Sequence, residues 1–205
     1  MVDVLTSIYR QMHDAIDALA QACEVIIIGS NDAAGSVRWR IPEKDTTLLR
    51  FDALPEPGSD ITPAVVHPHA GVLTFFQVDT TEAPPADWIR GISSLRPESN
   101  AQNLRSGSSA DRDFIAKHQV LRAMHLTPVD TLGTPGVPKF FILDIEGLDY
   151  DVTLSLLRHP DVVGIGCEHA LMSSDEVIML KCAAVDNGFR FVFGQEDAIF
   201  LSETH

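Results

Sequence analysis

Two pairs of polar residues in the second half of the chain stand where acid–base chemistry could take place. The apolar run 140–143 ends in Asp144 and Glu146, two carboxylates spaced two residues apart, with Gly147 behind them. On an extended strand end, residues with this spacing lie on the same side. Paired acids near a cleft can bind a hydroxyl group, accept its proton or shift each other's pKa. The alternative is that one of the two acids caps the N-terminus of a following helix.

Glu168 and His169 form the second pair, directly after the apolar run 162–167. A carboxylate beside an imidazole can orient the ring as a general base. If the two runs are neighbouring parallel strands, this pair lies beside Asp144 at the same sheet edge. The alternative is a Glu–His pair that only decorates the surface. Five further histidines show no metal-ligand spacing, so we expect no metal site: His67, His69, His118, His125 and His159.

A small-residue loop follows an earlier apolar run at 23–28 and could receive a ligand. Glycine permits a tight turn and a close approach to the backbone, and ligands of open α/β sheets sit beyond the carboxyl ends of strands. An ordinary strand-to-helix turn explains the loop equally well. The candidate ligand-binding residues of this loop are Gly29, Ser30, Asn31, Asp32 and Ser36.

Asp52 follows the next expected strand, 46–51. An acid at the end of the second strand can hydrogen-bond the two hydroxyls of a ribose, so Asp52 together with the loop after residue 28 favours a nucleoside ligand. Glu56 is the alternative in a shifted register. A solvated acidic loop would account for both acids without any ligand.

The order of the expected elements positions these residues. Strands and helices alternate along the chain, which predicts a doubly wound, Rossmann-like sheet that is mostly parallel and ends in an antiparallel C-terminal hairpin. Ser173 and Glu176 form a capping-box pattern before the last helix. We expect helices at 2–22, 149–158 and 177–185, a helical turn at 128–132, and strands at 23–28, 46–51, 64–67, 72–76, 119–126, 139–144, 162–167, 189–193 and 198–201.

Residues 79–113 interrupt this alternation with many Pro, Gly, Ser and Asn residues. The segment predicts a long, partly mobile loop with one helical turn at most. Long loops inside a compact domain are usually functional or disordered. We expect this loop either to close over a substrate or to mediate formation of a homodimer.

The charge balance excludes several classes of partner. The 205 residues include 29 acidic and 15 basic side chains, which gives a formal net charge of −14. Readers of nucleic acids need clustered Lys and Arg, and such a negative field also repels anionic membrane surfaces. We therefore expect neither nucleic acid nor a membrane as a partner. The length suits a single α/β domain over residues 1–205.

The three cysteines, Cys23, Cys167 and Cys182, argue against a disulfide framework and suit a reducing compartment. No apolar run reaches the length of a membrane span. Residues 1–11 lack the basic and apolar regions of a signal peptide. We expect a cytoplasmic protein.

The segment from about 119 to 201 resembles the C-terminal half of the FkbM-type methyltransferases. That family shows a "TLD-L" turn, an apolar strand ending in "(I/L)D(V/I)EG", a strand ending in an acid, a "GY/F" step and a last hairpin. The matching segments agree in order and spacing: Pro-Val-Asp-Thr-Leu at 128–132, Leu-Asp-Ile-Glu-Gly at 143–147, Cys-Glu-His at 167–169, Gly-Phe-Arg at 188–190 and Asp-Ala-Ile-Phe at 197–200.

The first half resembles the family less closely. The family's loop "D-x-G-A-N-x-G-x-x-S" holds S-adenosylmethionine, and Gly29, Asn31, Asp32 and Ser36 match it. Ile27 and Ala33 stand where the family has an acid and a second glycine. Asp52 matches the ribose-binding acid by position, but the helix expected after it is nearly missing. Segments at 71–76 and 93–95 resemble the family's "G-x-x-x-F" strand and a serine-containing loop.

The resemblance implies a methyltransferase that uses S-adenosylmethionine and acts on a hydroxyl of a small-molecule or carbohydrate acceptor. His169 or Glu168 would be the base, and Asp144 and Glu146 would orient the acceptor or contact the cofactor. Methyl transfer itself is mostly a matter of positioning. Two alternatives stay open: a non-catalytic methyltransferase-like binding or assembly module, and an α/β enzyme for another nucleotide.

Overall fold

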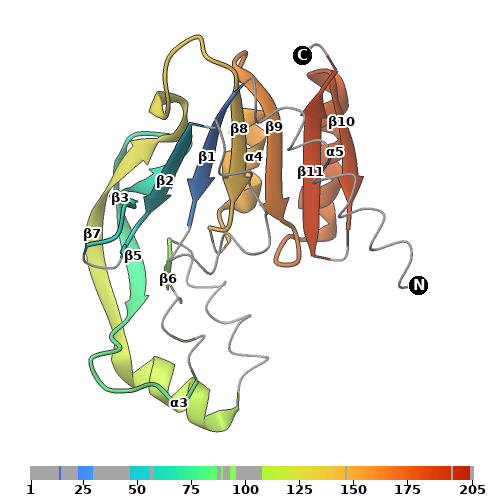
Figure 1. Ribbon diagram of the computed structural model, residues 1–205. Coiled ribbons are helices and arrows are strands. Elements are labelled where there is room, and N and C mark those ends of the chain that lie inside the picture. The colour runs from blue at the N-terminus through green and yellow to red at the C-terminus, as the bar shows by residue number, and fades with distance from the viewer. Residues whose placement is uncertain are drawn as a thin grey trace.

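A seven-stranded sheet at the centre of the molecule arranges its strands in the order β10-β11-β9-β8-β1-β2-β3 (Figure 1). The computed structural model describes residues 14, 23–29, 47–55, 58–86, 89, 93–95, 108–145, 147–194 and 196–203. The strands of this sheet are β1 (Glu24–Ile28), β2 (Leu48–Asp52), β3 (Thr62–Pro63), β8 (Lys139–Leu143), β9 (Val162–Glu168), β10 (Phe189–Phe193) and β11 (Asp197–Ser202).

The sheet is mostly parallel. Strands β3, β2, β1, β8 and β9 pair in parallel with their neighbours. Strand β11 is antiparallel to β9 and to β10, so β10 runs in the same direction as the parallel strands. The mixed α/β class and the antiparallel C-terminal hairpin predicted from the sequence are therefore confirmed.

The central strands are buried on both faces, as their apolar runs predict. Successive side chains of β1 and β8 point to opposite faces. Ile26, Ile28, Phe141 and Leu143 face one core cluster, and Val25, Ile27, Phe140 and Ile142 face the other. Helices α4 (Asp149–Leu156) and α5 (Ser174–Asp186) cover the first face, to which they contribute Val152, Leu156, Leu180 and Ala184 (Figure 1).

The N-terminal end of α5 confirms the capping box predicted from the sequence. The Ser173 hydroxyl accepts a hydrogen bond from the Glu176 N–H, and the Glu176 carboxylate accepts one from the Ser173 N–H. Gly188 follows the helix with a φ of +73°. This left-handed conformation is readily adopted by glycine and closes the helix. Among the described residues, no helix is long and apolar enough to cross a membrane.

A second sheet has the order β4-β7-β5-β6. It consists of β4 (Val65–His67), β5 (Gly71–Val78), β6 (Ser93–Ser94) and β7 (Gln119–Pro128), and a 3-10 turn at Val129–Thr131 follows β7. Strands β5 and β7 form a long antiparallel ribbon that runs from Gly71 opposite Leu126 to Val78 opposite Gln119. The ribbon extends away from the first sheet, and helix α3 (Ser109–His118) lies at its far end (Figure 1).

The prediction of a long loop at 79–113 with one helical turn at most is wrong at its C-terminal end. Helix α3 begins at Ser109 and runs to His118, behind a capping box of Ser108 and Asp111. Ile115 packs with Val78 and Ile89 in a small core cluster. Within α3 only Asp111 and Ile115 are buried, so the helix carries almost no apolar periodicity for a sequence reading to detect.

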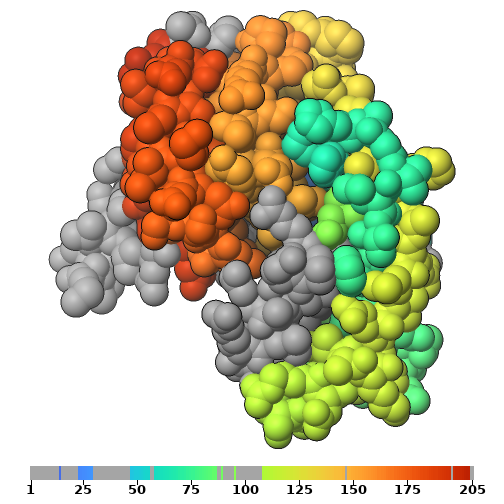
Figure 2. Space-filling model, turned by 180° about the vertical axis from the view of Figure 1, so that it is seen from behind, coloured from blue at the N-terminus to red at the C-terminus, as the bar shows by residue number. Residues whose placement is uncertain are grey.

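Figure 2 shows the molecule from behind. In this view the C-terminal third lies on one side and the second sheet on the other. Residues of α3 lie at one end of the molecule in this view. The helix predicted at 2–22 lies outside the described residues except for Asp14, which is helical.

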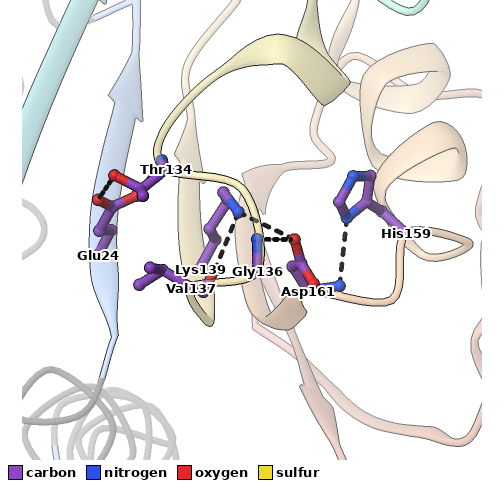
Figure 3. A network of polar contacts seen from close by, with 7 residues as sticks. All are labelled: Glu24, Thr134, Gly136, Val137, Lys139, His159 and Asp161. Carbon is purple, nitrogen blue, oxygen red and sulfur yellow. Dashed lines mark hydrogen bonds and ion pairs between the residues drawn. The ribbon is translucent and has the colours of Figure 1, made fainter.

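A polar network fixes the amino ends of β1, β8 and β9 (Figure 3). The Glu24 carboxylate, at the start of β1, accepts hydrogen bonds from the N–H of Thr134 at 2.7 Å and from its hydroxyl at 2.5 Å. Glu24 is only 7 % exposed. Buried charges are tolerated where hydrogen bonds satisfy them, so this pair ties β1 to the loop before β8.

Lys139 and Asp161 complete the network on the β8–β9 side. The Lys139 ammonium donates to the Val137 carbonyl at 2.9 Å and contacts Asp161 Oδ2 at 3.2 Å. The Gly136 N–H donates to the same carboxylate oxygen at 3.0 Å. The Gly136 N–H first, and then the Lys139 ammonium, hold the pKa of the Asp161 carboxyl below its usual value of 3.8.

Replacement of Glu24 by alanine tests the first half of this network. The Glu24→Ala variant removes a buried carboxylate that accepts hydrogen bonds from the N–H and the hydroxyl of the exposed Thr134, so we expect a loss of roughly 1–3 kcal/mol in the free energy of unfolding. Urea unfolding measures this loss. The matched control is Glu203→Ala at an exposed site, where a change within about 0.5 kcal/mol is expected. Equal effects in the two variants would contradict the role of Glu24.

The lowered pKa of Asp161 predicts a pH dependence of stability. Because the folded-state pKa lies below the unfolded value of 3.8, the carboxylate stabilises the fold above that pH and loses this effect as the pH falls through the folded value. We expect Asp161→Asn to be less stable than wild type near neutral pH, with the difference shrinking below a pH of about 3.8. Urea unfolding across this range is the measurement, with Asp130→Asn at an exposed site as the control. A difference that grows on acidification would contradict the prediction.

Candidate functional site

The carboxyl edge of the first sheet contains a topological switch point between β1 and β8. The chain passes from β1 to β2 and β3 on one side, and from β8 to β9 on the other. In open α/β sheets, ligands bind in the crevice outside the carboxyl ends of the strands at such a point. Gly29 and Asp144 are the residues that directly follow these two strands.

Gly29 lies in close backbone contact with both neighbouring strands. Its N–H donates to the Phe51 carbonyl at 2.9 Å, and the Asp144 N–H donates to the Ile28 carbonyl at 3.0 Å. Gly29 has a φ of +83°, and a Cβ atom at this position would lie 1.9 Å from the Asp144 carbonyl oxygen. Both the conformation and the space therefore require glycine here.

Ile28 of β1 pairs with Phe51 of β2. The next residues of the two strands, Gly29 and Asp52, therefore lie next to each other. Its side chain is only 7 % exposed. Carboxylate oxygen Oδ1 accepts a hydrogen bond from the Leu54 N–H at 2.8 Å, which forms an Asx turn. The structure thus places Asp52 at the predicted strand end and uses one of its oxygens to shape the turn that follows.

Asp144 and Glu168 lie side by side across β8 and β9, because Leu143 pairs with Cys167. Both residues are half-buried. Helix α4 begins after Leu148, which is its N-cap residue and makes no side-chain hydrogen bond to the helix. The pairing of β8 with β9 therefore brings Glu168 next to Asp144, as the sequence predicts.

His169 is held on the other side of β9, against the turn between β10 and β11. Its N–H donates to the Glu196 carbonyl at 2.7 Å, and ring atom Nε2 lies 3.3 Å from the Gly194 carbonyl oxygen. The imidazole centroid is 5.0 Å from that of Phe193. The Lys181 ammonium lies 4.5 Å from the centroid of the same phenyl ring.

Two buried acids near the end of β9 were not predicted as site residues from the sequence. Asp149 is 6 % exposed and Asp197 is 4 % exposed. Burial first, and then the negative charge of Asp149, raise the pKa of the Cys167 thiol. Thr153 opposes this rise, and the charges of Asp197 and Glu168 add smaller increases. Cys167 is therefore a neutral thiol and no nucleophile. Asp197 lies opposite Glu168 in the pairing of β11 with β9. The sequence does not record this pairing, so it could not identify Asp197 as part of the site.

The remaining predicted residues are not placed by the structure. Ser30, Asn31, Asp32, Ser36 and Glu146 lie outside the described residues. Within the described ranges, no group of three or more His, Cys, Asp or Glu side chains is arranged to hold a metal ion.

Comparisons with known proteins found no match for this chain, whether among protein-family models, curated proteins or solved structures. The function must therefore be inferred from the geometry of the sheet edge. That edge brings Gly29, Asp52, Asp144 and Glu168 to the ends of four adjacent strands, in the strand order β9-β8-β1-β2.

The close contact at Gly29 predicts the effect of adding a single methyl group. In Gly29→Ala the new Cβ collides with the Asp144 carbonyl, whereas in Gly58→Ala it meets no atom within 4 Å at a similar φ of +87°. We expect the control to lose about 1–2 kcal/mol from the left-handed conformation alone. The Gly29 variant should lose about 1–3 kcal/mol more from steric overlap. Urea unfolding compares the two, and equal losses would refute the contact.

Proposed function

We propose that this chain is an S-adenosylmethionine-dependent methyltransferase that methylates a hydroxyl of a sugar or secondary metabolite. The observation that carries the proposal is the row of acids at the carboxyl edge: Asp52 and Glu168 are the last residues of β2 and β9, and Asp144 directly follows β8. A negative edge attracts a cationic sulfonium and disfavours a phosphorylated acceptor.

The strand order supports the proposal at the level of the fold. Strands β3-β2-β1-β8-β9-β10 follow the doubly wound order 3-2-1-4-5-6, with the antiparallel β11 inserted between the last two. This arrangement is compatible with the Rossmann-like methyltransferase sheet that the FkbM resemblance implies. In that sheet the cofactor would lie across the ends of β1 and β2.

The described residues at those ends suit the cofactor in two respects. Gly29 turns the chain in a left-handed conformation directly after β1, and Asp52 ends β2 with a carboxylate where a ribose would be bound. When bound, S-adenosylmethionine supplies an electrophilic methyl group on a positively charged sulfur. Asp144 and Glu146 would orient the acceptor, and His169 or Glu168 would accept the proton of its hydroxyl.

A second candidate is a non-catalytic binding module that retains the methyltransferase sheet. The Oδ1 atom of Asp52 is engaged by the Leu54 N–H. Residues 53–55 and 58–61, which lie between β2 and β3, contain no helix. Both observations concern the cofactor side of the edge, and they favour a cofactor site that has degenerated.

Calorimetry with S-adenosylmethionine distinguishes the two candidates. We expect the wild type to bind the cofactor, and Asp52→Asn to bind at least about tenfold more weakly, a change of about 1.4 kcal/mol. Asparagine keeps an oxygen for the Leu54 N–H, so the turn is preserved while the charge is lost. The control is Asp60→Asn, because Asp60 is exposed and pairs with Arg50 away from the edge.

Absence of binding at millimolar cofactor, in protein shown to be folded by circular dichroism, would refute the methyltransferase and support the module. If the cofactor binds, formation of S-adenosylhomocysteine with a panel of sugars and hydroxylated metabolites identifies the acceptor. Unchanged affinity in Asp52→Asn would show that Asp52 does not contact the cofactor.

A further inference from the structure

The turn between β10 and β11 determines which nitrogen of His169 can act as a base. A carbonyl oxygen only accepts hydrogen bonds. Because Nε2 of His169 is bonded to the Gly194 carbonyl oxygen at 3.3 Å, Nε2 must carry the hydrogen. This holds for the neutral ring and for the charged ring alike. In the neutral ring, the nitrogen without a hydrogen is then Nδ1.

The ring is held from several directions. The backbone N–H of His169 donates to the Glu196 carbonyl, and the Gly194 N–H donates to the Asp197 carbonyl at 2.7 Å, which closes the turn. The Phe193 ring lies beside the imidazole at 5.0 Å. Phe193 itself is fixed by edge contacts with Phe191 and Phe200, both with centroids 5.8 Å away. A base held in one orientation loses little freedom when a substrate arrives.

The direction of the ring follows from this bond. The two nitrogens of an imidazole point in nearly opposite directions, so Nδ1 is directed away from the Gly194 carbonyl. The charged residues on the elements packed around the ring are Glu168 of β9, Glu196 of the turn, Asp197 of β11, Arg190 of β10, and Asp175, Glu176, Lys181 and Asp186 of α5. The Lys181 ammonium lies over Phe193. Glu168, the other candidate base, pairs across the sheet with the buried Asp197.

We propose that His169 is the base of the methyl transfer through Nδ1, and that the Gly194 carbonyl and the Phe193 ring are the positioning groups that select this tautomer. The inference rests on the proposed methyltransferase function. As the acceptor hydroxyl gives its proton to Nδ1, its oxygen forms a bond to the methyl carbon. The carbon–sulfur bond breaks with its electron pair left on sulfur. The imidazolium then releases the proton to water.

Nuclear magnetic resonance of the full chain tests the tautomer without any cofactor. Histidine labelled with nitrogen-15 gives distinct long-range proton–nitrogen patterns for the two neutral tautomers, and His169→Gln identifies the signals of His169. We expect the pattern with hydrogen on Nε2 at a pH where the ring is neutral. A pattern with hydrogen on Nδ1 would overturn the proposal, whatever the protein's activity.

Two substitutions separate the base from its positioning. In His169→Gln the side-chain amide can still donate to the Gly194 carbonyl but has no basic nitrogen, whereas in His169→Asn the shorter side chain places its amide near Nδ1. We expect the Gln variant to keep the wild-type melting temperature and cofactor affinity and to lose turnover by about 100-fold or more. The Asn variant should lose turnover and also melt at a lower temperature.

The outcomes distinguish the two proposals. The control is His125→Gln, at an exposed position of β7, which should retain full turnover. If His169→Gln retains turnover as well, the role of His169 as base is refuted while the methyltransferase function stands. If the wild type fails to bind S-adenosylmethionine, the function and the base are both refuted, and the tautomer pattern still decides whether the turn positions the ring.

Discussion

The junction at Gly29 is the constraint on which the carboxyl edge depends. Three strand ends meet there through backbone hydrogen bonds, from Gly29 to the Phe51 carbonyl and from Asp144 to the Ile28 carbonyl. The approach is so close that no side chain fits at position 29. Because β1, β2 and β8 end at this one place, the acids that follow β2 and β8 are brought to the same edge as the loop that follows β1.

The two edges of the sheet use charged residues in different ways. At the amino edge, Glu24 is satisfied by the Thr134 N–H and hydroxyl, and Lys139 by the Val137 carbonyl and Asp161 (Figure 3). These residues stabilise the start of β1, β8 and β9. At the carboxyl edge the acids gather around the ends of the same strands. The carboxyl edge is held by the backbone contacts of Gly29, so both ends of these strands contribute to stability.

Much of this arrangement can be predicted from the sequence, because short-range patterns encode it. The buried strands β1, β8 and β9 follow from continuous apolar runs, and α5 follows from the capping box of Ser173 and Glu176. Helix α3 does not follow in the same way. With Ile115 as its single buried apolar residue, α3 depends on contact with Val78 and Ile89, which lie elsewhere in the chain.

The sequence by itself determined which residues end the strands: Gly29, Asp144 and Glu168 follow continuous apolar runs, and Asp52 follows the strand expected at 46–51. Only the tertiary structure decided their neighbours. Strand order is set by pairing between distant segments, which no local sequence pattern records. This order places Asp144 beside Glu168, and Asp197 opposite Glu168. It also places the His169 ring against a carbonyl oxygen that lies 25 residues away in the sequence.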